Sequence, residues 1–131
     1  MPDLTLTDST VWVGFFRGNR AACQRLDPLL ADDAVRINGP IFAEIVSGAR
    51  DVAAQNEMKM LLLDVRWLRP AEPIWQRVAD TRFALARLGQ TCEILDVMIA
   101  LTAADWGVKL LTRDRDFQRI ARVLPLDLEV F

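Results

Sequence analysis

The sequence predicts an α/β fold in which helices cover both faces of a mainly parallel sheet. Short apolar segments of strand length alternate with longer segments of helical spacing along the whole chain, and this alternation is typical of a parallel sheet flanked by helices. The chain has 131 residues, of which 52% are hydrophobic and 26% charged, a composition that suits a globular protein. We therefore expect residues 1–131 to form a single domain.

The first half of the chain reads as short strands separated by helices. Residues 4–7 (LTLT) are a strand candidate, and Ser9 or Thr10 can cap a helix through 11–16 that ends at Gly18. The elements that follow are a helix over about 20–31, a strand over 34–38, a helix over 40–49 and a helix over 52–65.

The second half continues the alternation. Residues 67–70 (WLRP) form a short extended piece, and the helical spacing of 72–89 places Ile74, Val78, Leu85 and Leu88 inward. The remaining elements are a helix over 93–106 that is apolar nearly all round, a strand over 108–112, a helical turn over 117–123 and an extended segment over 126–131.

Several kinds of site are excluded by composition. The chain contains no histidine, and Cys23 and Cys92 stand alone, so a His/Cys zinc site and any nucleophile paired with histidine are excluded. The simplest interpretation of both cysteines is a buried free thiol. Apolar runs such as VWVGFF are far shorter than the roughly 18 residues of a membrane span, and MPDLTLTD has no basic leader. We therefore expect a cytoplasmic protein that does not contact a membrane.

Four carboxylates stand out because their surroundings are apolar. Asp8, Glu44 and Asp96 are each the only charged residue in an apolar stretch, and Asp114 directly follows the strand expected over 108–112. A buried carboxylate is costly without a partner. Each acid taken singly is explained by a bond to the backbone or to an arginine. The recurrence of the pattern favours a shared site.

The predicted topology gives these acids a common location. Ligands of parallel α/β sheets bind beyond the carboxyl ends of the strands, where Asp8 and Asp114 lie, and Glu44 and Asp96 fall in the early turns of their helices. Carboxylates about 4 Å apart repel by roughly 4 kcal/mol per pair at an effective dielectric near 20, so they need shared protons or a cation. Oxygen ligands favour Mg²⁺, with Mn²⁺ as the alternative, and such an ion orients phosphate and activates water.

Longer segments around these acids resemble the PIN-domain family. The resemblance covers TDSTVWVGFFRG, FAEIVSGAR, LDVMIALTAADWGVKLLTRDRDFQRI and the closing LEVF. Length and spacing are most similar to the VapC-type toxins of bacterial toxin–antitoxin pairs. The chain departs from the usual pattern at Thr7, where Val or Ile is commoner, and at Ser9 and Thr10, where the order of the two hydroxyl residues is exchanged. The resemblance implies a PIN-like sandwich.

The resemblance also implies site residues and a reaction. By this likeness Asp8, Glu44, Asp96 and Asp114 bind the metal, Asp116 is a further candidate ligand, and the Thr10 hydroxyl lies beside the metal. The RDRD segment leaves the fourth ligand open between Asp114 and Asp116, because Asp116 also suits a turn or a helix cap. The implied activity is an endoribonuclease that hydrolyses RNA phosphodiester bonds with Mg²⁺ and an activated water.

Arginines supply the expected contacts to RNA. The net charge is −2, and it becomes positive once the four candidate ligands are set aside. The chain has 14 arginines and 2 lysines, and Arg17, Arg113 and Arg115 stand beside the site motifs. Guanidinium groups pair well with phosphates, so we expect these three to bind the substrate, the alternative being solvated surface residues.

Other functional classes are weighed against this prediction. A catalytically idle PIN-fold module that binds RNA or protein is the alternative. A haloacid-dehalogenase-type phosphatase needs Asp-x-Asp where this chain has Asp8, Ser9 and Thr10, and a receiver needs a lysine after a later strand, whereas Lys109 lies inside one. Neither of those two classes fits.

Two protein partners are expected. The apolar run MKMLLL and the tryptophans Trp67, Trp75 and Trp106 offer more apolar surface than a domain of this size readily buries, which predicts a homodimer through the helices around 51–63 and 74–89. The acid-lined site is a receptor for an arginine, and the resemblance implies a cognate antitoxin that covers it. We expect the antitoxin's tail to carry an apolar anchor and an Arg or Lys.

Overall fold

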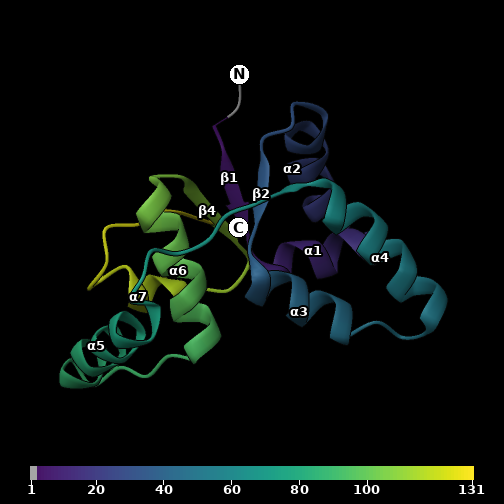
Figure 1. Cartoon of the computed structure of the whole chain (residues 1–131). Coiled ribbons are helices and arrows are strands. Elements are labelled where there is room, and N and C mark those ends of the chain that lie inside the picture. Colours follow the sequence, from purple (N-terminus) through teal and green to yellow (C-terminus); the bar gives the residue numbers. More distant parts are fainter. Residues whose placement is uncertain (1–2) are drawn as a thin grey trace.

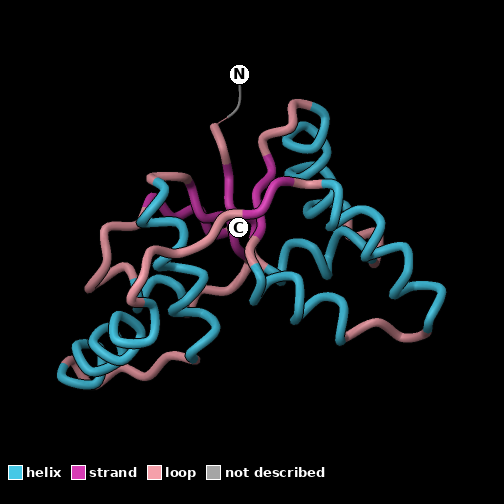
Figure 2. Tube along the Cα trace, viewed as in Figure 1, coloured by secondary structure: helices cyan, strands magenta, loops and turns pink. Residues whose placement is uncertain are grey.

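Five parallel strands form one central sheet in the computed structural model, which describes residues 3–131. The strand order is β3-β2-β1-β4-β5, and every pairing between neighbours is parallel. Figures 1 and 2 show the strands gathered in the middle of the molecule, with helices on either side. The strands are β1 (Thr5–Thr7), β2 (Val35–Ile37), β3 (Arg66–Trp67), β4 (Lys109–Thr112) and β5 (Asp127–Val130).

Helices fill the connections between the strands. In Figure 1, α1 to α4 lie on one side of the strands and α5 to α7 on the other. The helices are α1 (Ser9–Phe16), α2 (Arg20–Ala31), α3 (Gly39–Ser47), α4 (Val52–Asp64), α5 (Ile74–Arg87), α6 (Ile94–Trp106) and α7 (Phe117–Ile120). None of the helices within residues 3–131 has the length and apolar character needed to cross a membrane. The predicted α/β fold with a mainly parallel sheet is confirmed.

Polar side chains cap the helices in the first half of the chain. Asn19, Asn38 and Asp51 each accept a hydrogen bond from a backbone amide in the first turn of α2, α3 and α4. The cap of α1 is Asp8, whose carboxylate accepts from the amide of Thr10. The prediction that Ser9 or Thr10 caps this helix is therefore wrong, because the helix already begins at Ser9 and Asp8 occupies the extended position before it.

The core lies between the sheet and the inward faces of the helices. Ile74, Val78 and Leu85 of α5 are buried as predicted, but Leu88 is 46% exposed because it follows the last turn of α5. Helix α6 is buried through its middle, whereas Leu95 near its start and Trp106 at its end are exposed. The sequence of this helix is apolar nearly all round, but only its central turns are buried.

The register of β1 against β4 places two acids at one edge of the sheet. Thr7 is paired with Leu111, and the amide of Asp8 donates a hydrogen bond to the Leu111 carbonyl at 2.9 Å. Asp8 therefore leaves the sheet beside the residues that lead to Asp114. This is the carboxyl edge of a parallel sheet, where helix N-termini and ligands gather.

Candidate carboxylate site

Asp8 is the most buried acid of this edge, with 1% of its surface exposed. Its Oδ2 accepts hydrogen bonds of 2.8 Å from the hydroxyls of Thr10 and Thr112. Ser9 lies near its other oxygen, with Oγ 3.4 Å from Oδ1. The carboxylate is thus held in one orientation by hydroxyl groups of both neighbouring elements, α1 and β4.

Glu44 reaches the same place from the second turn of α3. Its Oε1 accepts a hydrogen bond of 3.3 Å from Ser9 Oγ, so Ser9 lies between Asp8 and Glu44. Burial raises the pKa of the Glu44 carboxyl, the negative charge of Asp8 raises it further, and the hydrogen bond from Ser9 acts in the opposite direction. Glu44 therefore has a carboxylate neighbour, and none of the ion pairs within residues 3–131 includes it.

Asp96 shows the strongest effect of this crowding. Burial raises its pKa to about 7, and the charges of Asp8, Glu44 and Asp114 contribute in that order. Such a shift means that the site disfavours a further negative charge at neutral pH. A bound cation reverses this preference, since it stabilises the ionised form.

The four predicted acids line one cavity, the carboxylate cavity. Its volume is about 340 Å³. The residues that line it are Asp8, Ser9, Thr10, Glu44, Glu93, Leu95, Asp96 and Asp114. Four segments that lie far apart in the sequence, around residues 8, 44, 96 and 114, thus come together.

Asp114 and Asp116 occupy different places. Asp114 lines the carboxylate cavity, and its Oδ1 accepts the amide of Asp116 at 2.9 Å. Asp116 is exposed, lines an adjacent cavity, and its Oδ1 lies 3.4 Å from Nη2 of Arg119. Asp116 precedes α7 without capping it through its side chain.

Two of the three predicted arginines line a second cavity, the Arg113 cavity, of about 430 Å³. It shares Thr10 with the carboxylate cavity and includes Arg17 and Arg113. Arg113 Nη1 donates to Asn19 Oδ1 at 2.8 Å, and its guanidinium lies 5.1 Å from the centre of the Phe131 ring. Arg115 is exposed and lines none of the cavities described here.

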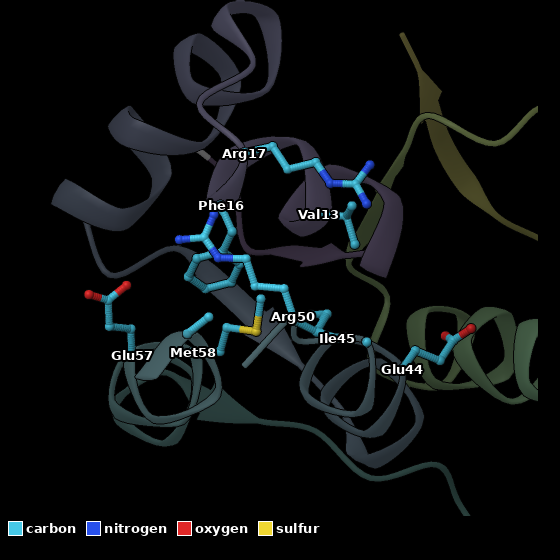
Figure 3. A pocket seen from close by; sticks show the side chains of 10 residues that line it. Val13, Phe16, Arg17, Glu44, Ile45, Arg50, Glu57 and Met58 are labelled. Carbon is cyan, nitrogen blue, oxygen red and sulfur yellow. The ribbon is translucent and has the colours of Figure 1, made fainter. Parts of the chain in front are cut away.

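A larger groove of about 470 Å³ runs between α1, α3 and α4 and reaches the site at Glu44. Figure 3 shows Glu44 and Glu57 at opposite ends of this groove, with Phe16, Arg50 and Met58 between them. Its lining therefore combines apolar side chains with charged ones, among them Arg50 between the two glutamates. We call it the α1–α4 groove.

The donors of the carboxylate cavity fit a hard divalent cation. They are carboxylate and hydroxyl oxygens, the ligands that Mg²⁺ and Mn²⁺ prefer. Across residues 3–131, no ion pair involves Asp8, Glu44, Asp96 or Asp114. In that same part of the chain, no three His, Cys, Asp or Glu side chains are already drawn together as a metal-binding group. The cavity brings the acids to one place without closing them around an ion.

Sequence reasoning missed three polar residues of this site. Thr112 donates to Asp8 Oδ2 and also accepts the amide of Asp114 at 2.9 Å, so it links the two acids. Ser9 links Asp8 to Glu44, and Glu93 lines the cavity one residue before α6. The sequence signal for Thr112 is a hydroxyl at the last position of an apolar strand, directly before the RDRD segment.

Comparison with known proteins assigns the chain to a protein family. Residues 5–123 match the PIN domain family. The chain is 33% identical to Ribonuclease VapC11 of Mycobacterium tuberculosis (strain ATCC 25618 / H37Rv), and the aligned region covers 98% of this chain and 99% of that protein. It is equally similar, with the same coverage, to VapC ribonuclease Mb1587 of Mycobacterium bovis (strain ATCC BAA-935 / AF2122/97).

Solved structures agree with the fold. VapBC2 from Rickettsia felis, bound to a DNA fragment from its promoter, matches with a TM-score of 0.76 at 18% identity over 96% of this chain and 97% of that chain. DNA-bound VapBC from Salmonella typhimurium also gives 0.76 at 18% identity, over 98% of each chain. At this identity the likeness concerns the fold alone. The resemblance read from the sequence motifs is confirmed, and the chain belongs to the PIN-domain family.

Proposed function

We propose that this chain is a metal-dependent endoribonuclease and the toxin of a toxin–antitoxin pair. The observation that carries the proposal is the carboxylate cavity, where Asp8, Glu44, Asp96 and Asp114 meet without a basic partner among the ion pairs of residues 3–131. The relatives named VapC ribonucleases, which match nearly end to end, support RNA as the substrate.

The four acids would hold Mg²⁺, with Mn²⁺ as the alternative ion. When bound, such an ion polarises a phosphate and makes water a better nucleophile. Asp114 is the proposed fourth ligand, because it lines the carboxylate cavity, whereas Asp116 lines the adjacent one and pairs with Arg119. Thr10 and Thr112 orient Asp8 through their hydroxyls, which leaves its Oδ1 as the less occupied oxygen.

The substrate strand would be held by arginines. Arg17 and Arg113 line a cavity that meets the carboxylate cavity at Thr10, so a phosphate there would lie beside the acids. Arg113 is held by Asn19 and by the Phe131 ring, which orients its guanidinium before substrate binds. Arg115 is exposed next to Asp114 and would contact the strand farther out.

Cleavage of labelled single-stranded RNA by the purified protein tests the proposal. We expect cleavage in Mg²⁺ or Mn²⁺, loss of cleavage in EDTA, recovery when Mg²⁺ is restored, and no cleavage of single-stranded DNA of the same sequence. RNA binding without cleavage in either metal would instead identify a catalytically idle binding module.

An antitoxin partner is proposed from the same surface. The solved neighbours with this fold include VapBC toxin–antitoxin complexes. The α1–α4 groove offers Phe16, Ile45 and Met58 to an apolar anchor and leads to Glu44 at the carboxylate cavity. A tail that places its anchor in the groove could extend an Arg or Lys to the acids, where a guanidinium pairs bidentately with carboxylate.

A homodimer is proposed from the exposed apolar side chains of α4 and α5. Met60 and Leu63 on α4 are 77% and 63% exposed, and Trp75 and Phe83 on α5 are both 65% exposed. Large exposed apolar side chains favour association, and here they occur on two helices that lie on different sides of the strands (Figure 1). Light scattering at tens of micromolar, a concentration on the order of a functional association, should give twice the monomer mass. A monomer under those conditions would contradict the proposal.

A further inference from the structure

A second arginine-lined cavity meets the carboxylate cavity at another wall. Its volume is about 200 Å³. It is lined by Arg82, Thr91, Cys92, Glu93, Asp96, Asp116 and Arg119. We call it the Arg82–Arg119 cavity. Glu93 and Asp96 belong to both cavities, so they form the wall between them.

One nitrogen of the Arg82 guanidinium is fixed by a hydrogen bond to another residue of this cavity. Its Nε donates a hydrogen bond of 3.0 Å to the carbonyl of Cys92, which ties α5 to the segment before α6. Within residues 3–131 its two terminal nitrogens make no hydrogen bond or ion pair with a carboxylate. A guanidinium oriented in this way keeps its fork of N–H donors for a planar or tetrahedral oxyanion.

Arg119 supplies the second cation, from α7. Its Nη2 lies 3.4 Å from Asp116 Oδ1, and the pair is exposed, so most of its five donors stay accessible. Both arginines are close enough to act on the Cys92 thiol, whose pKa is raised by burial and by the charges of Asp96 and Asp116, while Arg119 and Arg82 act in the opposite direction. The hydroxyl of Thr91 adds a further donor to the same cavity.

The location decides what kind of anion fits. A nucleic-acid strand carries one phosphate per nucleotide. If the scissile phosphate lies at the four acids, the phosphate of the adjacent nucleotide therefore lies at a wall of the carboxylate cavity. Thr10 marks the wall towards Arg17 and Arg113, and Asp96 marks the wall towards Arg82 and Arg119. Figure 1 shows α1 and the α5–α7 group on different sides of the β-strands. An RNA strand that crosses the four acids would therefore meet arginines on both sides.

We infer that the Arg82–Arg119 cavity binds the phosphate of the RNA nucleotide next to the scissile one. This inference rests on the proposed ribonuclease function. It assigns Arg82, Arg119 and Thr91 a role in holding the substrate, and it gives the strand a path from the Arg113 cavity past the four acids to α5 and α7. A cation at the acids would offset Glu93 and Asp96, which leaves the two arginines to attract the phosphate.

The test measures RNA binding without cleavage. The variants are made in an Asp8→Asn background. The double variant carries Arg82→Gln and Arg119→Gln, and Arg122→Gln is the matched control. Fluorescence anisotropy measures the affinity of each protein for a short fluorescein-labelled single-stranded RNA in Mg²⁺. Arg122 is exposed just after α7 and outside the cavity. We expect the double variant to bind about tenfold more weakly, on the scale of a lost charged phosphate contact. For the double variant, the plot of the logarithm of the RNA-binding constant against the logarithm of the salt concentration should be less steep by about 0.7 than for the control, which is the value for one phosphate contact on a single strand.

A second measurement needs no arginine variant. Iodoacetamide alkylates accessible thiols, and mass spectrometry reports its rate at each cysteine. RNA should slow the alkylation of Cys92, which lines the cavity, and leave Cys23 on α2 unchanged. Inorganic phosphate at the same phosphate concentration should protect Cys92 much less.

The outcomes separate this inference from the function on which it rests. If the Asp8→Asn protein binds RNA and the wild type cleaves it, but the double variant behaves like Arg122→Gln and Cys92 stays unprotected, the inference is wrong and the ribonuclease stands. Equal protection by inorganic phosphate identifies a general phosphate site and also overturns it. If the wild type cleaves no RNA and the Asp8→Asn protein binds none, both proposals fall.

Discussion

The two ends of helix α6 carry aspartates in opposite situations. Asp96 lies in its first turn at the carboxylate cavity, and its pKa is raised to about 7 by burial and by the charges of Asp8, Glu44 and Asp114. Asp105 lies near the other end, where Oδ2 accepts hydrogen bonds from Arg77 Nη1 at 2.8 Å and from the Ala71 amide at 2.7 Å. The pKa of Asp105 is lowered, first by the hydrogen bond from Arg77.

This difference separates an acid without an ion pair from a paired one. Asp105 has a cation from the protein itself, so its charge joins α5 to α6 and stabilises the fold. Asp96 takes part in none of the ion pairs within residues 3–131, and the charges that raise its pKa are those of other acids, so its charge opposes folding unless a cation comes from outside. Glu129 repeats the structural case, because it pairs with Arg25 at 2.8 Å and with Lys109 at 3.4 Å.

The largest expected effect is on catalysis and concerns only the unpaired acids. Asp8→Asn or Asp96→Asn should lower Mg²⁺-dependent RNA cleavage by about 100-fold or more, the scale of losing electrostatic stabilisation at a reacting phosphate. The melting temperature should stay the same or rise, because repulsion between the acids is relieved.

Asp105→Asn is the matched control for that prediction, since it makes the same change on the same helix. Its cleavage rate should stay near that of the wild type. Cleavage and thermal melting are measured for all three variants side by side. Wild-type activity in both Asp8→Asn and Asp96→Asn would remove the assignment of the site.

The next effect concerns the antitoxin's tail, which should recognise unpaired acids and ignore paired ones. Asp8→Asn should weaken binding of the tail peptide by about 1–3 kcal/mol, because a charged hydrogen-bond partner is lost. Added Mg²⁺ should weaken binding to the wild type, since the metal and the peptide's arginine compete for the same oxygens.

Calorimetry checks this prediction with a synthetic peptide that carries an apolar anchor and an arginine. The peptide is titrated into wild type, Asp8→Asn and Asp105→Asn, each with and without Mg²⁺. Asp105→Asn should bind like the wild type. Equal affinities under all conditions would show that the tail binds away from the acids.

A smaller effect is expected on stability at the paired end. Asp105→Asn should lower the free energy of unfolding by about 0.5–1 kcal/mol, because the ion pair with Arg77 is lost from a site close to solvent. Chemical denaturation at neutral pH measures it. Asp80→Asn, an exposed change on α5, is the control and should leave stability within about 0.5 kcal/mol of the wild type. No loss in Asp105→Asn would mean that the pair does not join the two helices.

The smallest effect is the pH dependence of the stability difference between the wild type and Asp105→Asn. The folded pKa of Asp105 is lowered below its ordinary value near 3.9, so the ion pair stabilises the fold above about pH 4. That stabilisation is lost as the pH falls through the lowered folded pKa. The stability difference between wild type and Asp105→Asn should therefore be constant from about pH 7 to about pH 5 and shrink below about pH 4. A difference that grows towards acid pH has the wrong sign for this pair.

Much of the fold was predictable because local signals are strong in this chain. The strand before Asp8 alternates leucine with threonine, the strand before Arg113 contains a short apolar run, and parallel strands follow from the helices between them. Leu88 was assigned wrongly to the core, because periodicity does not reveal where a helix ends. The residue that caps α1 was predicted one position too late, because the sequence pattern does not reveal where this helix begins either; the capping residue is Asp8.

The candidate site was predictable only in part. Lone acids in apolar segments pointed to Asp8, Glu44 and Asp96, since burying an unpaired charge is costly and needs a reason. Thr112 and Ser9 could not be distinguished from other hydroxyl residues, because their role depends on which carboxylate faces them across the fold. Which of Asp114 and Asp116 lines the carboxylate cavity likewise depends on the turn, in which Asp114 accepts the amide of Asp116.

The sequence by itself determined the alternation of strands and helices, the absence of histidine chemistry and the set of acids without local partners, because each depends on composition or on neighbours along the chain. Only the tertiary structure decided which acids are paired. Arg77 and Asp105 lie 28 residues apart, and Asp8 and Thr112 lie 104 residues apart. Electrostatic neighbours are set by distances in space, so Asp96 and Asp105 acquire opposite pKa shifts on one helix only after the fold brings acids to one end and an arginine to the other.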